Sequence, residues 1–119
     1  MALTRDYKET IKERAEKDPY FAASLMNEAI TAFLDGEPET ARVILRELVN
    51  STIGFELLAA QLDKSSKSIH RMLSSDGNPT MDNLTSILVT LQRKLDVDVQ
   101  VKLSSHHKSP RRAASRRLD

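Results

Sequence analysis

The basic side chains Lys67, His70 and Arg71 carry the chemistry that this sequence suggests most clearly. Their spacing places them on one side of a short helix, because residues three and four positions apart are neighbours on a helical surface. An arginine can donate two parallel hydrogen bonds to O6 and N7 of guanine, and a lysine can reach guanine or a phosphate. Ser66 lies just before them, in the exposed first turn. We therefore expect Ser66, Lys67, His70 and Arg71 to contact DNA bases.

The other side of this helix, which we expect over residues 66–74, is apolar. Ile69, Met72 and Leu73 share that side and would hold the helix against a core. Ser65 can cap the start of the helix, because its hydroxyl oxygen can accept a backbone N–H. A helix with an apolar back and hydrogen-bond donors in front has what a recognition helix in the major groove needs.

A second short helix is expected directly before it, over residues 54–62, with a tight turn at residues 63–65. Leu57, Leu58 and Leu62 would point inward, and Ala59 and Ala60 are small enough for helices to cross closely. Two short helices joined by such a turn make up a helix-turn-helix unit.

Contacts to DNA phosphates are expected from the edges of this unit. Gly54 and Phe55 begin the first short helix, where backbone N–H groups and the positive end of the helix dipole attract anions. Asn78 and Thr80 lie in the loop after the second helix, and Lys64 adds a cation in the turn. Turn formation alone explains Gly77 and Asn78 equally well.

The rest of the chain predicts an all-α fold, a bundle of five to six helices with one short C-terminal β-strand. Asp18 followed by Pro19 marks a helix start, and Gly36 marks its end. One apolar stripe along this helix would be formed by Phe21, Leu25, Ala29, Ile30, Phe33 and Leu34. Further helices are expected at about 4–16, 37–49 and 81–95, and residues 50–52 would end one helix and cap the next.

From residue 97 to residue 103, apolar and polar residues alternate strictly, which predicts a strand. A lone strand cannot satisfy its own backbone, so it would pair with a second copy, another segment or a different protein. Its apolar residues are Val97, Val99, Val101 and Leu103.

Charge divides the 119 residues into a domain at 1–103 and a basic tail at 104–119, which we expect to be disordered. Residues 102–119 hold six basic residues and one acid, a net charge of +5, whereas the remainder holds twelve basic and sixteen acidic residues, or −4. A basic tail suggests an anionic partner, although a solubilising end explains it equally well. The chain has no cysteine, no apolar run of about 20 residues and no secretory signal, which fits a cytoplasmic protein.

Enzymatic chemistry is not indicated. His70, His106 and His107 do not form a metal-binding set, and there is no glycine-rich phosphate loop. We expect no catalytic residue, no metal and no cofactor.

The sequence resembles two nested groups of proteins. The following residues look like the Xre or phage-repressor type of helix-turn-helix: Leu58-Ala59, Leu62, Ser65, Ile69, Arg71, Gly77-Asn78-Pro79-Thr80, Leu84 and Ile87. Over about residues 3–102 the chain also resembles the short addiction module antidote proteins, HigA-like antitoxins of type II toxin–antitoxin pairs. The matching parts are 4–9, 55–59, 64–68, 71–73 and 77–80.

This resemblance implies a homodimer that reads a palindromic double-stranded operator, represses its own operon and neutralises a RelE/HigB-type toxin. It puts Ser66, Lys67 and Arg71 at base-contacting positions, and Gly54 or Phe55 at a phosphate-contacting position. Asp63 stands where glycine is usual. Two alternatives remain open: a stand-alone phage- or transposon-type regulator without a toxin, and a helical protein-interaction module in which residues 18–49 dock a partner.

Overall fold

The fold is described from a computed structural model, which places residues 18–106. This part of the chain contains five α-helices: α2 (Pro19–Leu34), α3 (Pro38–Ser51), α4 (Phe55–Gln61), α5 (Ser66–Met72) and α6 (Met81–Leu95). The predicted helix at 4–16 and most of the predicted tail lie outside the described residues. None of the described helices is both long and apolar enough to cross a membrane.

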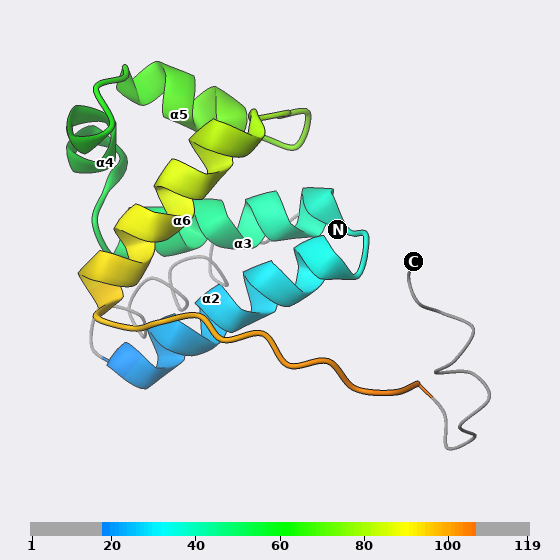
Figure 1. Cartoon of the computed structure of the whole chain (residues 1–119). Coiled ribbons are helices and arrows are strands. Elements are labelled where there is room, and N and C mark those ends of the chain that lie inside the picture. The colour runs from blue at the N-terminus through cyan, green and yellow to red at the C-terminus, as the bar shows by residue number, and fades with distance from the viewer. Residues whose placement is uncertain (1–17, 107–119) are drawn as a thin grey trace, which may run out of the picture.

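The helices form a bundle in which α2 and α3 make an antiparallel hairpin (Figure 1). The short helices α4 and α5 lie together at one end of the bundle, and α6 runs from beside α5 back toward α2. All five helices contribute to one core. Its residues are Ala22, Leu25, Met26, Ala29, Leu45, Leu48, Val49, Phe55, Leu58, Ala59, Ile69, Leu73, Ile87 and Leu91.

Local chemistry sets the ends of the first hairpin as the sequence predicts. A carboxylate oxygen of Asp18 accepts hydrogen bonds from the N–H groups of Tyr20 and Phe21, at 3.0 and 3.3 Å, and Pro19 occupies the first helical position. Gly36 follows the helix with a φ of +82°, which suits a residue without a Cβ atom. The N–H of Glu37 donates to the carbonyl of Ala32, so the last turn is closed before α3 begins.

Three predictions about helix ends and faces are wrong in detail. The helix predicted to break at residue 50 continues to Ser51, and the hydroxyls of Ser51 and Thr52 donate back to the Leu48 carbonyl instead of capping α4. Leu57 is 50% exposed, although it was expected to face inward, and Leu34, expected in the apolar stripe of α2, is 69% exposed. Leu34 is the last residue of α2, whereas Leu57 lies off the buried side of α4, which is formed by Phe55, Leu58 and Ala59 at helical spacing.

The predicted C-terminal strand is not confirmed. Residues 97–103 leave α6 without regular secondary structure, and residues 98–106 are exposed. A strand is defined by its hydrogen-bonded neighbour, and no segment of the described chain pairs with this one.

Candidate nucleic-acid interface

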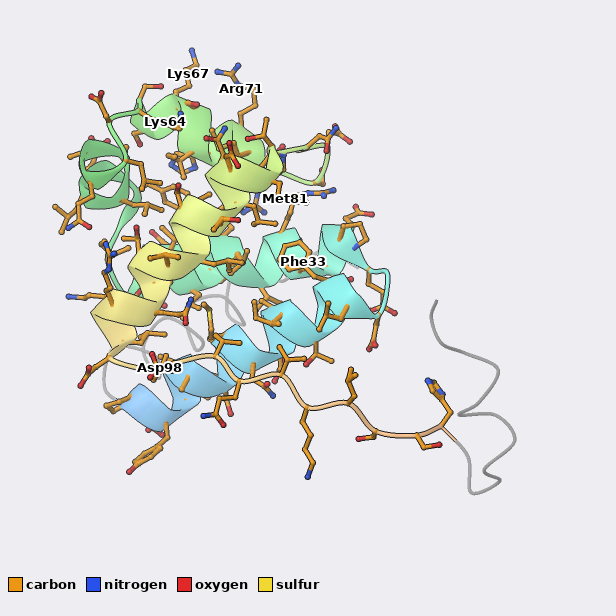
Figure 2. The ribbon with its side chains drawn as sticks, in the orientation of Figure 1. Phe33, Lys64, Lys67, Arg71, Met81 and Asp98 are labelled. Atoms are coloured by element: carbon orange, nitrogen blue, oxygen red, sulfur yellow. The ribbon has the colours of Figure 1, made fainter. Side chains whose placement is uncertain are left out.

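The helix α5 separates its two faces in the way that the sequence predicts. Ile69 and Leu73 are fully buried, and Met72 packs against the same core from a partly buried position. Lys67 and Arg71 are exposed on the opposite side. Figure 2 shows both side chains projecting away from the bundle at its outer end. The core therefore determines which side of α5 meets solvent.

Lys64 is also exposed, in the connection that leads into α5. We call the side chains of Lys64, Lys67 and Arg71 the basic edge. The carboxylates of Glu56, Asp63 and Asp76, which lie in α4, in the turn and in the following loop, are exposed as well.

The start of α5 is fixed by a hydrogen bond from its own first turn. Ser65 is the N-cap, and its hydroxyl oxygen accepts the N–H of Ser68 at 3.0 Å. Ser66 is the first helical residue and is half-buried. The cap leaves Ser66 and Lys67 in the first turn, which is the part of a recognition helix that lies closest to base edges.

The turn between α4 and α5 depends on Asp63. This residue has a φ of +57°, a left-handed conformation that glycine adopts freely and that aspartate tolerates better than most residues. The N–H of Asp63 donates to the Ala60 carbonyl and that of Lys64 donates to the Ala59 carbonyl, at 3.2 and 2.9 Å. Asp63 thus performs the conformational role usually given to glycine, and it brings a negative charge next to the basic edge.

His70 is placed differently from the other expected base-contacting residues. Its ring stacks on Phe55, with ring centroids 3.8 Å apart and planes 15° from parallel. His70 is exposed and Phe55 is buried, so the imidazole covers the phenyl ring and joins α5 to the start of α4. The aromatic contact gives His70 a structural role that its sequence position did not reveal.

The expected phosphate-contacting residues fall into two groups. Gly54 and Phe55 lie where α4 begins, but the N–H of Gly54 already donates to the Val49 carbonyl at 2.7 Å. The N–H of Phe55 lies in the first helical turn, where amides have no acceptor within the helix. Of this first group, Phe55 is therefore the better backbone donor.

Asn78 and Thr80 form the second group, and both are exposed in the loop between α5 and α6. Thr80 is the N-cap of α6, because its hydroxyl oxygen accepts the N–H of Asn83 at 3.1 Å. A hydroxyl that accepts one hydrogen bond still has its own hydrogen to donate. Thr80 can therefore cap the helix and donate to a phosphate at the same time.

Arg42 positions this loop, and sequence reasoning missed it. From α3 its guanidinium donates through Nε to the Ser74 carbonyl at 2.9 Å and through Nη2 to the Ser75 carbonyl at 2.8 Å. These carbonyls follow the last residue of α5, so Arg42 connects the hairpin to the end of the helix that carries the basic edge. A partner 32 positions away leaves no local periodic signal.

Gly77 closes the loop against α5. A Cβ atom built on Gly77 would lie 2.2 Å from the Met72 carbonyl oxygen and 2.7 Å from that of Arg71. Such distances are far inside van der Waals contact with backbone atoms, so only glycine fits here. The sequence reading treated Gly77 as a turn residue or a phosphate contact; the structure adds close packing as a third reason.

Within residues 18–106, Arg42 and Gly77 hold one end of α5, the Ser65 cap holds the other, and the core holds its apolar side. The site is thus a short, rigidly placed helix that presents lysine and arginine to solvent. No protein-family model matches the chain, and comparison with curated proteins and with solved structures gives no significant match either. The function must therefore be inferred from this geometry.

Proposed function

We propose that this protein is a transcriptional repressor whose α4 and α5 form a helix-turn-helix that reads operator DNA. One observation carries the proposal: α5 has fully buried Ile69 and Leu73 on one side and exposed Lys67 and Arg71 on the other. A helix of this kind enters the major groove without disturbing the core that holds it.

The two ends of the basic edge have different tasks in this proposal. Arg71 reads guanine through paired hydrogen bonds to O6 and N7, and Lys67 reaches guanine or a flanking phosphate. Lys64, the Phe55 amide, Asn78 and Thr80 hold the phosphate backbone on either side. These phosphate contacts fix the register of α5 on the duplex but do not select its sequence.

Two copies of the chain would read a palindrome, with their α5 helices about 34 Å apart along the duplex. A single short helix contacts few base pairs, so pairing is the usual route to useful specificity. The proposed place of action is the cytoplasm.

The likeness to HigA-like antidote proteins extends the proposal to an antitoxin that represses its own operon and neutralises a RelE/HigB-type toxin. A neighbouring reading frame for a basic protein of about 100 residues would support this extension. Its absence would leave a stand-alone regulator of the phage or transposon type.

The main experiment measures binding of the purified chain to the DNA upstream of its own gene by fluorescence anisotropy. Arg71→Ala should lose about 1–3 kcal/mol of specific binding, close to 5- to 150-fold in affinity. Arg93→Ala is the matched control, because Arg93 is also exposed but lies in the last turn of α6, away from α5. Equal binding by both variants and the unaltered chain would remove Arg71 from the readout.

Salt separates this proposal from a protein-interaction module. Binding through phosphate contacts weakens steeply as salt rises, because each neutralised phosphate releases counterions. An apolar docking surface shows no such loss. If the chain binds no DNA even at low salt, the repressor proposal is wrong.

A further inference from the structure

The segment 97–103 combines three features that together suggest a partner. Its odd-numbered residues are apolar and its even-numbered residues are polar. Val101 is 65% exposed and Leu103 is 91% exposed, so the apolar side remains uncovered in one chain. Asp98 and Lys102 are both exposed and carry opposite charges. They lie two positions before and two positions after Gln100 in the sequence.

The root of the segment is held in a fixed direction. Asp96 ends α6 in a left-handed conformation with a φ of +56°, and the N–H of Val97 donates to the Gln92 carbonyl at 3.0 Å. The side-chain oxygen of Gln92 then accepts the N–H of Val99 at 3.1 Å. The edge of the segment that carries the Val99 N–H therefore faces α6.

Successive backbone N–H groups of an extended chain point to opposite edges. Because the Val99 N–H faces α6, the backbone groups of Asp98, Gln100 and Lys102 face the open edge. An antiparallel partner would therefore exchange its hydrogen bonds with these three even-numbered residues.

We propose that residues 97–103 of two copies pair as antiparallel strands, with Gln100 on the two-fold axis. In this register Asp98 lies opposite Lys102 of the second copy, and Lys102 lies opposite its Asp98. Val99 faces Val101 and Val97 faces Leu103 in the same way. A shift of the axis to residue 101 loses both opposite-charge pairs. A shift to residue 99 would place Lys102 opposite Asp96, but Asp96 ends α6 in a left-handed conformation and lies outside the extended segment, so charge and the end of α6 together select the register.

The pairing also brings the apolar residues of both strands to one side. Val97 is half-buried where the segment leaves α6, so the apolar side begins against the bundle and is exposed further along. Two strands alone are marginally stable in water, and packing on a helical surface supplies the support they need.

This inference deepens the proposed function, since reading a palindrome needs a pair, but it can be tested without DNA. The chain has no cysteine, so single cysteines report register directly. Gln100→Cys should give a covalent dimer on mild oxidation, because residues paired across antiparallel strands lie within disulfide reach. Asp98→Cys alone should not, whereas an equal mixture of Asp98→Cys and Lys102→Cys should give the mixed dimer.

Charge exchange provides a second measurement on the full-length chain, by sedimentation equilibrium. Asp98→Lys or Lys102→Asp alone should weaken dimerisation at least about fivefold, because two opposite-charge pairs become like-charge pairs. The double exchange should restore it, and Asp82→Lys on α6 is the control for a change in net charge.

Two results would overturn the pairing: a chain that stays monomeric at micromolar concentration, or Asp98→Cys linking as readily as Gln100→Cys. A dimer with the stated register that binds no DNA would keep this inference and reject the repressor. If the substitutions do not change dimerisation and the dimer binds DNA, the strand pairing is wrong and the repressor proposal stands.

Discussion

Replacing Arg42 by methionine tests whether the hairpin positions the end of the proposed recognition helix. The change keeps much of the apolar stem and removes the donors to the Ser74 and Ser75 carbonyls, at 2.9 and 2.8 Å. A hydrogen bond from a charged donor contributes about 1.5–3 kcal/mol. The bond to Ser75 is exposed, so water replaces much of its value. We expect a net loss of about 1–2 kcal/mol in the free energy of unfolding.

The assay is urea unfolding followed by circular dichroism, together with a thermal scan. A loss of this size lowers Tm by roughly 4–15 °C in a domain of this length. Arg42→Lys should recover part of the loss, because an ammonium group can reach one carbonyl but cannot bridge both in a fixed fork. Arg46→Met, one turn further along α3, is the matched control and should shift the midpoint by less than half as much.

Binding to DNA adds a second readout. Loosening of the loop at 73–80 should weaken operator binding by Arg42→Met beyond what the unfolded fraction explains, since this loop carries Asn78 and Thr80. An unchanged urea midpoint in Arg42→Met would show that the two hydrogen bonds add nothing. If Arg42→Met lowers stability but leaves operator affinity unchanged, Arg42 stabilises the fold and does not contribute to DNA binding.

The other predictions concern the turn, the loop and the aromatic pair. Gly77→Ala should cost about 1–3 kcal/mol or more of unfolding free energy by urea titration, because its Cβ would overlap the Met72 carbonyl oxygen. Gly36→Ala, with open space but a φ of +82°, should cost only about 1 kcal/mol, and an equal or smaller cost at Gly77 would contradict the close approach. Asp63→Asn keeps a side chain that tolerates a φ of +57° but removes a charge, so operator affinity should rise about two- to fivefold at low salt with stability unchanged. Weaker binding would show that the carboxylate assists the complex. His70→Ala should cost about 0.5–1.5 kcal/mol of stability through the lost stack on Phe55, and His70→Phe should keep it. If a stable His70→Phe variant no longer discriminates between bases, His70 contacts the bases after all.

Much of the local structure could be read from the sequence. Asp18-Pro19 and Gly36 bound α2, and the two faces of α5 follow from the positions of Ile69, Lys67 and Arg71. The left-handed turn at Asp63 could be anticipated from the resemblance, because Asp63 stands where glycine is usual. These features depend on chemistry within a few residues, where caps, conformational preferences and helical periodicity act.

The positions that sequence reading missed depend on partners distant in the chain. Arg42 acts on a loop 32 residues away, and His70 covers the ring of Phe55 across a turn. Leu57 is exposed because the core takes the side of α4 formed by Phe55, Leu58 and Ala59, and two neighbouring leucines do not show which of them faces the core. A helical period states which side of a helix is apolar but not how far the surrounding elements extend.

Within residues 18–106, the sequence by itself determined the positions of the helices, the caps of α2 and α5 and the exposure of Lys67 and Arg71, because short-range physics fixes each of them. Only the tertiary structure decided what holds α5 in place, through the Arg42 bonds and the close approach of Gly77. It also decided that residues 97–103 have no strand partner within the described chain, because a strand needs a hydrogen-bonded neighbour. Periodicity indicates the type of the element in which a residue lies. Contacts between distant residues depend on where the other elements lie in the folded chain.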